Sequence, residues 1–148
     1  MSNLTAHFTL AEFTRSESAK RHGVSNQPTP EHLQNIIALC VNVLEPLRAR
    51  FGPINISSGY RSKTLNRWIG GQLKSQHLVG EAADLDMDGF SSVTNKEIFD
   101  YIKNNLTFDQ LLNEFNYSWI HVSYSKVANR KQVLNALKDN GRTVYTKH

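Results

Sequence analysis

The segment SQHLVGEAADLD, residues 75–86, places a histidine and a carboxylate in a stretch that is otherwise rich in small and apolar residues. His77 and Asp84 lie seven residues apart, where the chain enters the segment EAADLDM, whose alternating pattern indicates a strand. A charge in a buried strand is costly unless another group pairs with it. Gly80 permits the turn that would bring the histidine back towards the carboxylate. We therefore expect a metal ion to be the partner of this pair.

The length and composition favour one globular domain spanning residues 1–148. A chain of 148 residues can bury one substantial core, and a charged fraction of 20% argues against disorder. The longest apolar run, IIALCVNVL, is too short to cross a bilayer, so we expect no membrane insertion. The start, MSNLTAHFTLAEF, lacks the pattern of a signal peptide, which predicts a protein that is cytoplasmic when made.

The single cysteine, Cys40, excludes an intramolecular disulfide and a zinc site built from several cysteines. It lies in an apolar helical pattern, so we interpret it as a buried core thiol. A catalytic metal would therefore be held by histidine and by aspartate or glutamate.

Helical signals dominate the first third of the chain. A capping box at Thr9 and Glu12 predicts a short helix that ends near Gly23. Apolar residues at three- and four-residue steps predict an amphipathic helix over residues 29–52, kinked or interrupted at Pro46.

Strand signals dominate the rest. A second capping box predicts a helix over residues 94–105, and an Asn-Gly pair at residues 140–141 predicts a hairpin. Four further segments read as strands or strands entering turns: residues 54–60, 81–87, 108–115 and 119–124. The expected class is α+β, with N-terminal helices packed on a small, mostly antiparallel sheet.

The net charge of +4 is concentrated at the C-terminal end. Residues 125–148 hold six basic residues against one acidic residue, and include the predicted hairpin. Such a basic segment suggests a polyanionic partner, either nucleic acid or an anionic bacterial envelope, or else simply a solubilising surface. Nucleic acid is not expected, because the segment lacks interleaved aromatic residues and any recognisable docking motif.

A second histidine, His121, stands in the aromatic and β-branched segment WIHVSY. It is either a metal ligand or a buried histidine that is hydrogen-bonded to backbone. If the tip of the hairpin before it is Tyr117-Ser118, Glu114 lies directly opposite His121, at roughly 5 Å. That position would suit a general base beside a catalytic metal, whereas the plainer alternative is an exposed glutamate at a strand end.

These residues together resemble a known family. The pattern SGYRS, LN, IGG and SQHLVGEAADLD, followed by FDQLLNEF and WIHVSY, is similar to zinc D-alanyl-D-alanine carboxypeptidases and their relatives. The relatives include vancomycin-resistance dipeptidases and phage endolysins that cut the L-alanyl-D-glutamate bond, and the fold is shared with the hedgehog signalling domain. The resemblance runs from about Phe8 to Tyr124. The opening FTLAEFTRSESAKRHGV looks like a subgroup common in phages and prophages.

The resemblance implies one zinc ion per chain, with His77, Asp84 and His121 as its ligands. Many relatives place the catalytic base three residues before the last histidine, where this chain has Ser118, which has no carboxylate. The hedgehog-like arrangement, with the acid across the hairpin, fits Glu114 as the base instead.

Further site residues follow from the same resemblance. Arg61 is expected to meet a peptide carboxylate or the developing oxyanion, unless it is an exposed turn arginine. Ser75 and Gln76 are expected to hydrogen-bond the substrate or to shape the loop, and Trp119 to line the cleft or to belong to the core. Asp86 is expected to be polar support rather than a ligand.

The resemblance thus implies a zinc metallopeptidase that hydrolyses peptidoglycan stem peptides, of the D-Ala-D-Ala carboxypeptidase or the L-Ala-D-Glu endopeptidase type. It would be a phage or prophage protein, favoured as a monomer, that acts at the bacterial cell wall after release or as part of a phage particle. The alternative is a catalytically silent zinc-containing domain that binds the wall or builds the particle.

Overall fold

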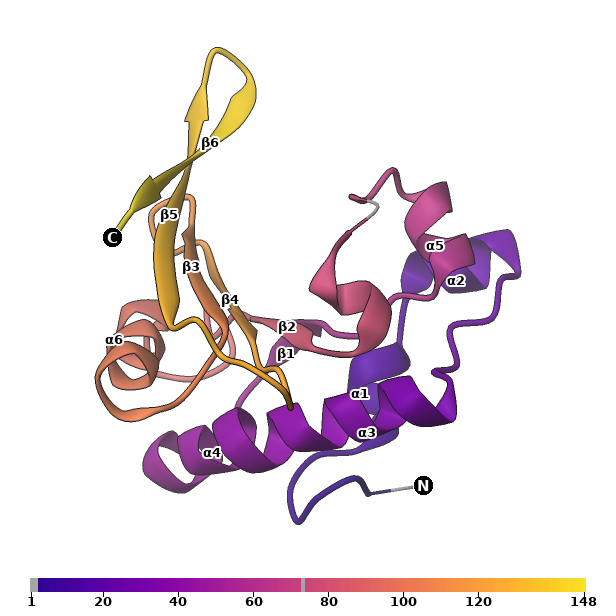
Figure 1. Ribbon diagram of the computed structural model, residues 1–148, viewed down its shortest axis with the longest axis horizontal. Coiled ribbons are helices and arrows are strands. Elements are labelled where there is room, and N and C mark those ends of the chain that lie inside the picture. Colours follow the sequence, from indigo (N-terminus) through magenta and orange to yellow (C-terminus); the bar gives the residue numbers. More distant parts are fainter. Residues whose placement is uncertain (1–2, 73) are drawn as a thin grey trace.

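The computed structural model describes residues 3–72 and 74–148, and its helices lie beside one six-stranded sheet, from which the last two strands project (Figure 1). The helices are α1 (Leu10–Thr14), α2 (Glu17–His22), α3 (Pro30–Leu39), α4 (Glu45–Phe51), α5 (Lys63–Trp68) and α6 (Asn95–Asn105). The strands are β1 (Ile56–Ser58), β2 (Ala82–Leu85), β3 (Gln110–Glu114), β4 (Trp119–Ser123), β5 (Gln132–Asp139) and β6 (Arg142–Lys147).

The strand order is β1-β2-β4-β3-β5-β6. β3 and β5 pair in parallel, and the other four pairings in the described part of the chain are antiparallel. The predicted α+β class with a mostly antiparallel sheet is confirmed. No helix in residues 3–72 and 74–148 is both long and apolar enough to cross a membrane.

The first predicted helix is in fact two helices, so the prediction of one helix up to Gly23 is wrong. The capping box of Thr9 and Glu12 opens α1, but Arg15 then takes an extended conformation. The Ser16 hydroxyl accepts a hydrogen bond from the Ala19 backbone at 3.1 Å and starts α2 afresh. A good capping residue inside a helical pattern can therefore restart the helix rather than continue it.

The long amphipathic helix widens just before Pro46. Between α3 and α4, residues Cys40–Leu44 form a π-helical turn, in which Glu45 N–H donates to the Cys40 carbonyl. Proline has no N–H to offer the preceding turn, so the ladder must adjust there. The chain stays helical through Pro46 and ends at Gly52, so the predicted interruption takes the form of this turn. Cys40 is fully buried, as predicted for a core thiol. Burial raises the pKa of this thiol.

The core lies where the α3–α4 helix and α6 meet one face of the sheet. In Figure 1, α3 and α4 run as one long helix beside β1 and β2, while α6 lies against the other part of the sheet. Fully buried side chains from each layer fill this space: Ile36, Leu39, Val43, Leu44, Leu47, Leu85, Ile98, Phe99, Ile102, Leu111, Ile120 and Val122. Because successive side chains of a strand point to opposite faces, the residues between these core positions point away from the core, to the other face of the sheet.

The hairpin between β3 and β4 turns in a register that differs from the predicted one. Glu114 pairs with Trp119, and Leu112 pairs with His121, so Glu114 is not directly opposite His121. The loop holds four residues, and three of them, Phe115, Asn116 and Tyr117, have positive φ. A shift of two positions preserves the face of each side chain, so Glu114 remains on the face of His121.

The hairpin between β5 and β6 confirms the Asn-Gly turn. Asn140 and Gly141 both have positive φ, as a tight two-residue turn that matches the strand twist requires. The far part of this hairpin projects from the body in Figure 1, because β5 pairs with β3 only as far as Ala136.

Gly80 offers a test of how the chain returns to β2. A Cβ there would lie 2.5 Å from the His32 carbonyl oxygen in α3, and φ is +80°, whereas Gly23 has a similar φ of +65° and open space around it. Gly23→Ala should cost about 1 kcal/mol of unfolding free energy from backbone strain, and Gly80→Ala at least about 3 kcal/mol because a backbone contact must also move. Urea unfolding of both variants measures the difference; equal losses would contradict the close packing of this turn.

Candidate metal centre

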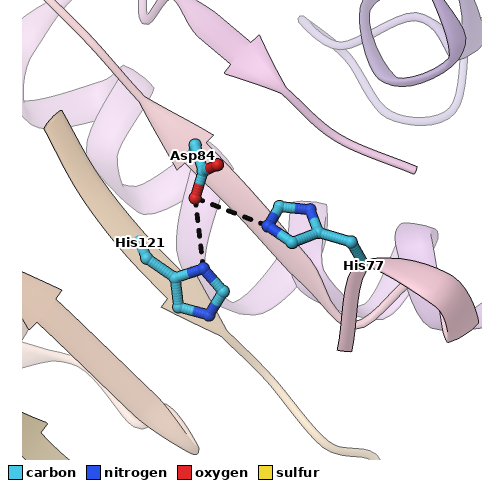
Figure 2. A group of neighbouring side chains, drawn as sticks. All are labelled: His77, Asp84 and His121. Carbon is cyan, nitrogen blue, oxygen red and sulfur yellow. Dashed lines mark hydrogen bonds and ion pairs between the residues drawn. The ribbon is translucent and has the colours of Figure 1, made fainter. Parts of the chain in front are cut away.

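Three side chains from separate elements converge on one point (Figure 2). His77 lies on a 3-10 turn, η2 (Gln76–Val79), while Asp84 and His121 are directly paired residues of β2 and β4. Asp84 Oδ1 is 3.4 Å from His77 Nε2 and 3.1 Å from His121 Nδ1. The three ligand atoms all lie within 4.8 Å of one another, close enough to bind one metal ion.

His77 is held in the orientation that a ligand needs. The Ser75 hydroxyl accepts from His77 N–H at 3.2 Å at the start of the turn, and Gly80 closes the turn in the left-handed conformation. His77 Nδ1 lies 2.6 Å from the Gly59 carbonyl and donates to it. That bond occupies Nδ1 and leaves Nε2 as the ring nitrogen that faces Asp84.

Asp84 is kept ionised despite its burial. Burial alone would raise the pKa of its carboxyl, but hydrogen bonds and charge from His121 and His77 outweigh this and hold that pKa far below its usual range. Two imidazoles and one carboxylate, with room left beside them, are a donor set that suits a catalytic zinc ion. The residues present therefore fit the metal that the sequence led us to expect.

A cavity of about 620 Å³ opens over the three ligands. Its lining includes every other residue that the sequence placed at the site: Arg61, Ser75, Gln76, Glu114 and Trp119. The structure thus brings the predicted site residues together, and their chemical roles stay predictions. The volume of the cavity is within the usual range for sites that bind small ligands.

Glu114 is the carboxylate best placed to exchange protons. It is half-buried at the end of β3, on the face that carries His121. Burial raises the pKa of its carboxyl; the charge of Asp84 adds to this and that of His121 opposes it. A raised pKa moves a carboxylate towards the range in which a general base works best. Ser118, in contrast, is exposed and donates to the Phe115 carbonyl at 2.7 Å, outside the cavity.

Arg61 reaches the same cavity from the loop after β1. Its backbone N–H donates to the His77 carbonyl at 3.1 Å, and Nη2 is 3.5 Å from the Ser75 hydroxyl. Within residues 3–72 and 74–148, its Nε atom is buried and has no hydrogen-bond partner. Burial lowers the pKa of the guanidinium, while the charge of Asp84 acts in the opposite sense. A buried donor without a partner is unusual and suits a group that awaits a ligand.

Gly71 explains the double glycine that follows α5. A Cβ at this position would lie 2.0 Å from Asn66 Oδ1 and 3.0 Å from Arg61 Nη1. Asn66 in turn donates to the Gln72 carbonyl at 3.0 Å. The absence of a side chain at Gly71 leaves the space that Asn66 and the guanidinium occupy.

A network of hydrogen bonds centred on Asp109 was not predicted from the sequence. This carboxylate is 5% exposed and accepts from Arg130 Nε at 2.9 Å and Nη2 at 3.0 Å. It also accepts from Gln76 Nε2 at 3.0 Å, so the residue before His77 is tied to the sheet. No local pattern predicts this network, because its members are 21 and 33 residues apart along the chain.

Asp86 stands apart from the ligands. The strand β2 ends at Leu85, and Asp86 accepts from Asn95 Nδ2 at 3.1 Å and from the Asp88 backbone at 3.1 Å. It therefore fastens the start of α6 to the end of β2.

The family of peptidases described as Peptidase M15 matches the chain over residues 6–123. The matched region contains all three candidate ligands together with Glu114 and Arg61. No protein of curated function matches the sequence.

The Asp109 network predicts a pH-dependent contribution to stability. The hydrogen bond from Arg130 lowers the pKa of the Asp109 carboxyl against the effect of burial, so the bonded pair stabilises the fold above the unfolded pKa. Asp109→Asn should lower the unfolding free energy by about 2 kcal/mol at pH 7, and the difference should shrink as the pH falls below about 4. Urea unfolding of the chelator-treated wild type and variant, at pH 7 and at a pH below about 4, measures this difference in unfolding free energy.

Asp100→Asn is the matched control, because Asp100 pairs with Lys96 at 2.7 Å on the exposed side of α6. It should change stability little at either pH, since surface ion pairs contribute little. Equal effects of the two substitutions would contradict a structural role for the Asp109 network.

Proposed function

The chain belongs to the peptidase M15 family, and we propose that it is a zinc-dependent peptidase that hydrolyses peptide bonds in peptidoglycan stem peptides. One observation carries this proposal: His77, Asp84 and His121 bring three ligand atoms within 4.8 Å, in a cavity that also holds Glu114. Three ligands with space beside them are typical of a catalytic zinc centre, whereas structural zinc sites are normally closed by four.

The protein supplies the proton chemistry. Zinc, when bound, would contribute Lewis acidity that activates water and polarises the scissile carbonyl. Glu114 is proposed to accept the proton from the attacking water and to return it to the leaving amine. Its raised pKa supports the first step, because a carboxylate with a higher pKa is a stronger proton acceptor.

Arg61 is proposed to bind negative charge on the substrate, either a peptide carboxylate or the developing oxyanion. Its position in the lining of the cavity that holds the candidate ligands supports this role, because a planar cation held there would stabilise negative charge. Ser75 and Trp119 line the same cavity and are proposed to contact the substrate. Both Nε2 hydrogens of Gln76 have partners, on Asp109 and Glu81, so its carbonyl oxygen is the atom we propose for a substrate contact.

The substrate class rests on the family and on charge. The cavity is lined by the cationic side chains of Arg61, Lys74 and Arg130, which suits stem peptides because they carry free carboxylates. The reaction is proposed to be of the D-Ala-D-Ala carboxypeptidase or the L-Ala-D-Glu endopeptidase type. We further propose that the protein comes from a phage or prophage, works as a monomer, and meets the wall after release or within a phage particle.

A catalytically silent zinc domain that binds the wall or builds a phage particle is the alternative function. Ser118, at the position where many relatives carry the base, favours it. A half-buried Glu114 on the same cavity favours the enzyme. The two functions differ in whether peptide bonds are cut.

The Glu114→Gln variant separates these functions. It should bind one zinc ion per chain like the wild type, and turnover should fall at least about 100-fold, because the general base is lost while the ligands remain. Mass spectrometry of digested peptidoglycan measures the products, and the fragment masses identify the bond. His77→Ala is the control, which should lose both zinc and activity. Zinc-loaded wild-type protein that leaves the stem peptides intact would establish the silent domain instead.

Arg61→Lys tests the anion anchor, because lysine keeps the charge and loses the planar fork. We expect kcat/KM to fall by about 10- to 100-fold with unchanged zinc content. Arg67→Lys, an exposed arginine of α5, is the control and should behave as wild type. Steady-state kinetics on the peptide bond identified above gives the comparison. Wild-type kinetics for Arg61→Lys would remove this residue from the site.

A further inference from the structure

The floor of the cavity continues across the sheet, past the ligands and into the C-terminal strands. One row of directly paired residues runs from Asp84 to His121, then to Leu112 and to Leu134. A second row runs from Trp119 to Glu114, then to Ala136 and to Tyr145. These residues share one face of the sheet, because directly paired residues point to the same side.

Leu134 of β5 and Tyr145 of β6 line the cavity that holds the metal ligands. Both lie outside the region that matches the peptidase family, which ends at residue 123. Ala136 lies between Glu114 and Tyr145 in the second row and is itself fully buried, so Glu114 and Tyr145 are the members of β3 and β6 in this row that reach the cavity.

Tyr145 contributes little to the core. Its side chain is 48% exposed, and it lies on the strand at the edge of the sheet. The neighbouring Val144 pairs with Leu137, and both of these side chains point to the opposite face. An aromatic side chain that is half-exposed on a catalytic cavity is well suited to bind a ligand.

Arg130 completes this end of the cavity. Asp109 accepts from its Nε and Nη2 atoms, which fixes the guanidinium and leaves the Nη1 hydrogens outside that ion pair. The end of the cavity formed by the C-terminal segment therefore offers one aliphatic surface, one aromatic surface and one fixed hydrogen-bond donor.

We propose that β5 and β6 form an extended subsite, which binds substrate residues beyond the scissile bond on the side remote from Arg61. Arg61 follows β1 at one end of the strand order, and Tyr145 is on β6 at the other. From β3, the two added strands extend the floor by about 10 Å, enough for about three residues of extended peptide. This inference rests on the proposed peptidase function, and it makes the protein selective for long peptides over dipeptides.

Two synthetic peptides that contain one candidate bond, L-Ala-D-Glu, test the proposal. One ends a single residue to each side of the bond, and the other continues for three further residues in both directions. The zinc-loaded wild type should cleave the long peptide with at least 10-fold higher kcat/KM than the short one. Tyr145→Ala should raise KM for the long peptide about 10-fold, with little change in kcat and none on the short peptide. Val144→Ala is the matched control and should equal the wild type.

Calorimetric binding of the long peptide to zinc-loaded Glu114→Gln protein, with and without Tyr145→Ala, gives a readout that is independent of turnover. Weaker binding on loss of Tyr145, but not on loss of Val144, supports the subsite even if no bond is cut, in which case the peptidase function alone fails. A wild type without length preference, or equal binding by all variants, overturns the subsite while leaving any observed peptidase activity in place.

Discussion

The contact of one carboxylate with two imidazoles is the interaction around which this fold is arranged. Asp84 is partly buried, and such a position is tolerable for an ionised carboxylate only because His77 and His121 face it. The antiparallel pairing of β2 with β4 sets one of these contacts directly. The turn that ends at Gly80 sets the other. A one-residue slip of β2 against β4 would send the carboxylate into the apolar core, so the chemistry and the strand register depend on each other.

The N-terminal helices support this centre through a short chain of contacts. Gly59, whose carbonyl orients His77, packs so closely on α1 that a Cβ would lie 2.7 Å from the Phe13 backbone. The next residue, Tyr60, donates its N–H to the Phe13 carbonyl at 2.7 Å. The position of α1 therefore influences the orientation of His77 through the backbone of Gly59 and Tyr60. The requirement for glycine at this point is one of proximity, since no positive φ is involved.

Local patterns in the sequence predicted much of the fold, whereas the set of three candidate ligands came from the resemblance to a family. The capping boxes at Thr9 and Thr94 and the Asn140-Gly141 turn are short-range signals, and each of them lies where it was predicted. The predictions of one helix up to Gly23 and of a β3–β4 hairpin with its tip at Tyr117-Ser118 were wrong. Competing local hydrogen bonds decide both the restart of the helix at Ser16 and the register of the hairpin. The network of Asp109, Gln76 and Arg130 could not be predicted, because it depends on how distant segments pack and no periodicity marks it.

Because the C-terminal strands join the sheet beyond β3, the wall of the cavity and the position of the candidate ligands depend on different parts of the chain. β5 and β6 are added beyond β3, after the last candidate ligand in the chain, and among the described strands they pair with neither β2 nor β4. Substitutions on their exposed surfaces can therefore change what lies over the cavity without moving the ligands. The outer pair of strands can therefore be exchanged or redesigned as a separate part, while the frame that holds the candidate ligands stays unchanged.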